Sequence, residues 1–166
     1  MSGINNFLSE QEIKRLREEG GALLNIKESS VDMITDPLIL EFISAISDQE
    51  YLDFEVLQQK EFMKFWPYIA IHRYADGDFT YIYFGSYLVD HFGFERTGVK
   101  VSEIDHPVQR NELLHILNEV LNTKKPSYAV GNLEIFKKGY KKWQQIKIPL
   151  RRNGQINEVL SFIVFS

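Results

Sequence analysis

Cysteine is absent from this chain of 166 residues. Its absence excludes disulfide bonds, zinc–cysteine sites, thiolate catalysis and flavin photochemistry that needs a cysteinyl adduct. The loops G-x-G-x-x-G and G-x-x-x-x-G-K-[ST] are missing too, which argues against a Rossmann protein or a P-loop enzyme. What these absences leave most naturally is a binding or sensing domain.

Long hydrophobic runs and an excess of one charge are also lacking. No stretch approaches the ~18 apolar residues of a membrane span, and the N-terminus has no apolar signal-peptide core. We therefore expect a cytoplasmic protein without a membrane partner. The net charge is −4, from 19 basic and 23 acidic residues that are intermixed along the chain, so we expect no nucleic-acid partner.

Aromatic residues make up 13% of the chain, and 44% of it is hydrophobic, which suits one substantial core. The most informative stretch runs from Phe79 to Gly98. Phe79, Tyr81 and Tyr83 alternate with smaller residues, which predicts a strand with these three rings facing the helices. Gly85 then breaks the strand, Ser86 is expected to cap a short helix, and glycine ends that helix. Such a segment is typical of a pocket wall.

The remaining elements follow from periodicity and turn residues. Helices are expected over 9–20, from Asp36-Pro37, over 53–66 and over 107–123, and strands over 68–74, 79–84, 127–136, 143–150 and 158–165. Asp76-Gly77 and Asn153-Gly154 are expected to turn hairpins. This order predicts an α+β fold, a five-stranded antiparallel sheet with helices on one face. Residues 1–50 would form a helical N-terminal extension and residues 51–166 the sensor domain.

Three segments carry a family resemblance. They are FTYIYFGSYLV with the FGFERTG turn, VSEI and KKPSY on either side of the long helix, and IKIPLRRNGQINEVLSF at the end. In this order and spacing the chain resembles a PAS domain, and more narrowly the stand-alone bacterial PAS family of alphaproteobacteria, over roughly residues 50–166. The resemblance implies a non-catalytic sensory or signalling module. It would hold a small molecule, or an apolar core, between sheet and helices, and it would act on a partner protein, often as a homodimer.

Candidate ligand-binding residues are the aromatic side chains expected near that space. Tyrosine hydroxyls in such a place need partners, which makes them useful lining groups. The candidates are Phe79, Tyr81, Tyr83, Tyr87, His91 and Tyr128. The alternative is an aromatic core whose hydroxyls reach the surface.

Histidine spacing gives little support to a cofactor or metal. His115 is the only histidine inside the long helix, where a haem ligand would lie, but the helical wheel places it toward water. His106 precedes Pro107 and is expected to cap the same helix. No pair of histidines shows i, i+4 spacing, so neither a metal nor a cofactor is expected.

Two other classes of function stay open. An isomerase or dehydratase would need an acid in an apolar pocket. Asp90-His91 is the nearest acid–histidine pair, but the two side chains should point apart on their helix. A constitutive interaction module is the other alternative, because the helix after Asp36 is apolar over more than half its circumference. That helix predicts a homodimer, unless it packs on the sheet of its own chain.

Overall fold

The computed structural model describes residues 27–29, 31–133 and 138–166, so the helix expected over 9–20 lies outside the described residues. Along the chain the elements are β1 (Lys27–Ser29), η2 (Val31–Met33), α2 (Pro37–Ile46), β2 (Leu52–Asp53), α3 (Phe54–Leu57), η3 (Lys60–Tyr68), β3 (Ile69–Ala75), β4 (Asp78–Phe84), α4 (Ser86–Phe92), η4 (Val101–Glu103), α5 (Pro107–Thr123), β5 (Ser127–Leu133), β6 (Lys138–Arg152) and β7 (Gln155–Phe165). The η elements are 3₁₀ helices. None of the helices among these residues is long and apolar enough to cross a membrane.

The described strands form one sheet in the order β1-β5-β6-β7-β3-β4, with β2 pairing beside β6. The five strands from β3 to β7 pair antiparallel, as the sequence predicts. Because β2 runs parallel to β6, the complete sheet is mixed and larger than predicted. The α+β class is confirmed.

Tight turns close the two hairpins at the predicted places. Asp76 and Gly77 have φ of 53° and 79°, and Asn153 and Gly154 have φ of 52° and 76°. Two consecutive residues with positive φ match the right-handed twist of the flanking strands. These residue pairs therefore fix how β3 meets β4 and how β6 meets β7.

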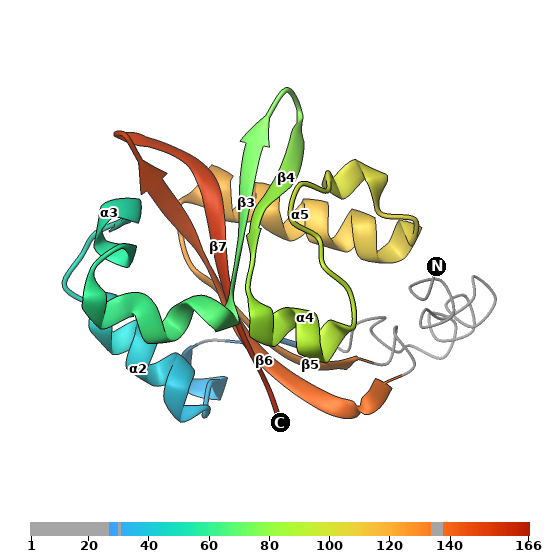
Figure 1. The fold of residues 1–166 in the computed structure, drawn as a ribbon, viewed down its shortest axis with the longest axis horizontal. Coiled ribbons are helices and arrows are strands. Elements are labelled where there is room, and N and C mark those ends of the chain that lie inside the picture. Colours follow the sequence, from blue (N-terminus) through green and yellow to red (C-terminus); the bar gives the residue numbers. More distant parts are fainter. Residues whose placement is uncertain (1–26, 30, 134–137) are drawn as a thin grey trace.

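Helices cover both faces of the sheet, so the prediction of one covered face is wrong (Figure 1). One face, called here the α2 face, lies under α2, α3 and η3, and its core includes Phe42, Phe65 and Phe162. The other, called the α5 face, lies under α4, η4 and α5. Since α2 packs on the sheet of its own chain, its apolar side does not require a partner molecule.

A β-bulge in β4 divides two neighbouring tyrosines between these faces. Ile71 pairs with Tyr83 and His72 pairs with Tyr81, so Ile82 is an extra residue between them. In a regular strand Tyr81 and Tyr83 would share a face, but one extra residue reverses the alternation. The prediction that both point the same way is therefore wrong: Tyr81 lies in the core of the α5 face and Tyr83 packs with that of the α2 face.

Gly85 joins β4 to α4 and is required for a steric reason. A Cβ at this position would lie 2.2 Å from the carbonyl oxygen of Pro67 in η3. The helix cap is also Gly85, with no side-chain hydrogen bond, so Ser86 is the first helical residue and not the predicted cap. The expected cap at α5 is confirmed, because the Nδ1 atom of His106 accepts a hydrogen bond from the Gln109 N–H at 3.2 Å.

Candidate functional site

A cavity of about 100 Å³ lies between the α5 face of the sheet and the helices α4 and α5. Apolar and aromatic side chains form one part of its wall: Phe84, Phe92, Phe94, Leu113, Ile116, Trp143 and Ile163. Polar side chains form the other: His72, Tyr81, Arg96, Gln109, Gln145, Lys147 and Ser161. The cavity is therefore amphipathic and could hold a small molecule with a polar and an apolar end.

The strand register separates these two ends. Lys147 of β6 lies opposite Ser161 of β7, and Ser161 lies opposite Ala70 of β3. Two residues along β3, His72 lies opposite Tyr81 of β4. In the other direction β6 reaches Trp143 and β7 reaches Ile163 and Phe165. Polar groups thus dominate the sheet wall toward His72, while the lining toward Trp143, beyond Gln145 and Ile163, is mainly aromatic and aliphatic.

Lys147 is a buried lysine in the middle of the sheet. Its side chain is 6% exposed, and its Nζ donates hydrogen bonds to Gln145 Oε1 at 2.7 Å and to Ser161 Oγ at 3.0 Å. Burial lowers the pKa of the ammonium group from 10.5 to about 7, because the charged form has lost its hydration. Two of its three N–H donors are used by the protein, which leaves one for a ligand.

Arg96 reaches the same cavity from the loop after α4. It is 9% exposed, and its guanidinium donates to Gln109 Oε1 at 3.0 Å and to the Tyr81 hydroxyl at 3.4 Å. The Cζ atom also lies 4.2 Å from the centroid of the Phe94 ring. A guanidinium keeps its charge in proteins, so this loop brings a positive charge to the edge of the cavity.

His72 lines the same cavity as these two side chains and has no hydrogen-bond partner in the structure. It is 2% exposed, and both ring nitrogens are buried and unpaired in the structure. Desolvation, and then the charges of Lys147 and Arg96, hold its pKa well below 6.5. The imidazole is therefore neutral and offers one donor and one acceptor. An unpaired polar group of this kind costs about 1–3 kcal/mol.

The α2 face of the sheet carries a buried carboxylate whose charge is compensated by ion pairs. Glu158 is 1% exposed and accepts from Arg73 Nε at 3.0 Å and from Arg152 at 2.9 Å and 3.1 Å. Lys147 and Arg96 form no ion pair with any described carboxylate, and no carboxylate lines the cavity. The charge of Arg96, and that of Lys147 in its protonated form, is thus not compensated by any described carboxylate.

Of the six candidate residues, Tyr81 alone lines this cavity. Phe79 is completely buried in the α5-face core. The hydroxyl of Tyr87 exchanges hydrogen bonds with the backbone of Phe165, and His91 stacks on the Phe165 ring with centroids 4.8 Å apart. These three residues lie on the α5 side of the sheet but outside the cavity lining.

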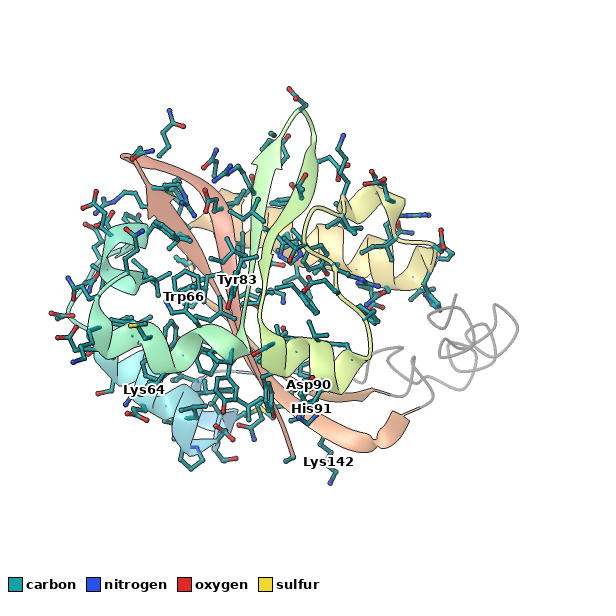
Figure 2. All side chains as sticks on the ribbon, viewed as in Figure 1. Lys64, Trp66, Tyr83, Asp90, His91 and Lys142 are labelled. Atoms are coloured by element: carbon teal, nitrogen blue, oxygen red, sulfur yellow. The ribbon has the colours of Figure 1, made fainter. Side chains whose placement is uncertain are left out.

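The other two candidates lie on the α2 face. The Tyr83 hydroxyl donates to the Trp66 carbonyl at 3.0 Å, and its ring meets the Trp66 ring edge to face; Figure 2 labels the two residues next to each other. Tyr128 lines a separate pocket of about 180 Å³ with Ile43 and Ile146. The predicted aromatic set is therefore divided by the sheet.

Lys147 and Arg96 were not predicted as site residues. In a sheet covered on one face, alternate residues of the C-terminal strands point into water. A lysine at such a position is therefore expected to be an ordinary surface residue. The available signal was Lys147 itself, because it lies between Ile146 and Ile148 in a strand with neighbours on both sides. In a strand buried on both faces, such a lysine cannot reach solvent and needs a special environment.

His115 and the Asp90-His91 pair lie outside the cavity lining. His115 is 77% exposed, which confirms that it faces water. Asp90 is exposed on α4, outside the cavity lining, so the acid–histidine pair considered for catalysis does not enter it (Figure 2). Within the described ranges, no three histidine or acidic side chains gather into a metal-binding group.

In comparison with known proteins, the chain matches no family model, no curated protein and no solved structure. Its function is therefore argued from the cavity.

Proposed function

We propose that this chain is a PAS-like sensory module that binds a small molecule in the cavity beneath α4 and α5. The resemblance in sequence implies a ligand between the sheet and the helices, and the cavity lies between the sheet and two of them. A bound molecule would change how α4 and α5 pack, and the signal would pass to a partner protein by contact.

The observation that carries this proposal is the unpaired His72 at the cavity wall. Buried polar groups are almost always hydrogen-bonded, and a group without a partner inside a cavity points to a molecule that supplies one. A constitutive interaction module would have no use for a buried polar group without a partner at this position.

Native mass spectrometry of the full chain tests the proposal. The protein as purified, and after incubation with a mixed library of neutral, anionic and cationic small molecules, is compared with its denatured mass. The variant Ala70→Leu adds volume at a lining position, whereas Tyr83→Phe changes the α2 face and serves as the control. We expect a non-covalent adduct with the wild type and the control that Ala70→Leu loses while remaining folded. Absence of any adduct, or an adduct unaffected by Ala70→Leu, would contradict the proposal.

A further inference from the structure

The class of ligand can be inferred from the charges and shape of the cavity; this step rests on the proposed function. We propose that the cavity binds a small aromatic monocarboxylate, with its carboxylate between Lys147 and Arg96 and its ring against the aromatic end. No group of the protein itself supplies this negative charge among the described residues.

Charge indicates an anion. Arg96 and the ammonium form of Lys147 share a cavity without a carboxylate, although the buried Glu158 of the same sheet has two arginines. Buried charges are normally paired. A carboxylate bound here would accept the unused N–H of Lys147 and an N–H of Arg96, and it would give the neutral His72 an acceptor for its ring N–H. Hydrogen bonds between charged groups are the strong ones.

The lining indicates a single ring, and the volume excludes anything larger. A buried cavity of about 150 Å³ lined by apolar residues binds benzene, whereas this cavity measures about 100 Å³, so a ring that carries a carboxylate enters only when the lining side chains move apart. Phe84, Phe92 and Trp143 supply the flat apolar surface that an aromatic ring packs against. Inorganic phosphate would satisfy the cations but would leave the apolar end without contacts.

Benzoate is the probe, benzamide its neutral isostere, and inorganic phosphate the control anion. Affinities for the full chain are measured by isothermal titration calorimetry. We expect benzoate to bind about tenfold or more tightly than benzamide, since a hydrogen bond to a charged group contributes about 1.5–3 kcal/mol. Phosphate should bind more weakly than benzoate.

Two variants assign the binding to the cavity. Lys147→Met and Arg96→Met should each lower benzoate affinity about tenfold or more and leave benzamide affinity nearly unchanged. Lys142→Met is the matched control, because Lys142 is an exposed lysine of the same strand (Figure 2). It should leave both affinities unchanged.

The outcomes separate this inference from the proposed function. Benzamide binding as tightly as benzoate, or Lys147→Met and Arg96→Met both retaining benzoate affinity within twofold, would overturn the anionic class. Phosphate binding in preference to benzoate would overturn the aromatic class. In each case the proposed sensory function would still hold if some other adduct is lost in Ala70→Leu. The absence of every adduct would contradict both the sensory function and the ligand class.

Discussion

The α2 face and the α5 face of the sheet differ in which side chains they bury. On the α2 face Phe42, Phe65 and Phe162 are each at most 1% exposed, and their ring centroids lie 4.7–5.7 Å apart. On the α5 face a cavity separates the sheet from the helices, and the side chains that line it include His72 and Lys147. Both faces enclose a pocket, but buried polar side chains line only the one on the α5 face.

The difference indicates a division of tasks. Close apolar packing is the main source of stability. A buried lysine without a carboxylate lowers stability, because its charge has lost its hydration. Groups with strongly shifted pKa values gather at functional sites. The α2 face therefore stabilises the fold, and the stability that it provides offsets the cost of the α5 face.

The largest effect is expected from removing an aromatic ring of the α2 face. Phe162→Ala should lower the free energy of unfolding by about 3–5 kcal/mol, since it leaves a void against Phe42, Phe65 and Tyr68. Urea denaturation measures the loss. The control Met63→Ala, at a position 63% exposed, should change stability by less than about 0.5 kcal/mol. Benzoate affinity of the folded Phe162→Ala protein should stay within twofold, and a larger change would show that the two faces are not independent.

A substitution on the α5 face should increase the free energy of unfolding instead of lowering it. Lys147→Met removes a buried charge and keeps the length of the side chain, so we expect the ligand-free protein to become more stable at pH 7 by about 1–4 kcal/mol. Thermal and urea unfolding measure the gain. A variant less stable than the wild type would show that the hydrogen bonds to Gln145 and Ser161 outweigh the desolvation of the charge.

The pH dependence of this gain follows from the lowered pKa of Lys147. Between the folded pKa of about 7 and the unfolded value of 10.5, the unfolded chain holds a proton that the folded chain lacks. Wild-type stability should therefore rise with pH relative to Lys147→Met, by about 0.7 kcal/mol per pH unit at pH 7, where the folded lysine is half protonated, and by about 1.4 kcal/mol per pH unit above pH 8. Urea denaturation of both proteins at pH 7, 8 and 9 measures the slope, and His72, whose pKa lies well below 6.5, does not titrate there. A constant difference would contradict the shift.

A smaller effect should appear where the two helical layers meet. Gly85→Ala would place a methyl group 2.2 Å from the Pro67 carbonyl oxygen, which forces α4 and η3 apart and should cost about 1–3 kcal/mol. The backbone at Gly85, with φ of −66°, suits alanine, so the cost is steric. Ser86→Ala, at the exposed next position, is the control for urea denaturation and should stay within about 0.5 kcal/mol. Equal stability of the two variants would contradict the close contact.

The smallest effects should distinguish two neighbouring tyrosines. Tyr81→Phe and Tyr83→Phe each remove one hydroxyl that has a hydrogen-bond partner, so each should cost about 0.5–1.5 kcal/mol of stability. Only Tyr81→Phe should weaken benzoate binding, by about two- to tenfold, because its hydroxyl helps to position Arg96. Calorimetry compares the pair, and an equal loss of affinity in both variants would contradict their division between the faces.

Local chemistry allowed much of the fold to be predicted. Asp76-Gly77 and Asn153-Gly154 specify their turns because these residues tolerate positive φ, and His106-Pro107 specifies a helix start. None of these signals depends on distant parts of the chain. The antiparallel strands followed from the same local patterns.

The site depended on contacts that are distant in sequence. Nothing local marks Ile82 as an extra residue, so alternation alone placed Tyr83 beside Tyr81. The covering of the Lys147 side of the sheet by α4 and α5, opposite α2 and η3, is likewise a tertiary fact, and it turns Lys147 from a surface residue into a buried one. The residues that would bind a ligand were therefore the ones that local patterns could not identify.

The edge strand β4 is covered by the segment that carries Arg96, and this has a consequence for aggregation. The Tyr81 N–H donates to the Val99 carbonyl and the Gly98 N–H donates to the Tyr81 carbonyl, at 2.9 Å and 2.7 Å. Unpaired edge strands are where β-sheets recruit strands of other molecules. A variant that loosens residues 96–100 would expose that edge while both cores stay intact. We then expect the variant protein to self-associate while it is still folded, because the edge of β4 is exposed.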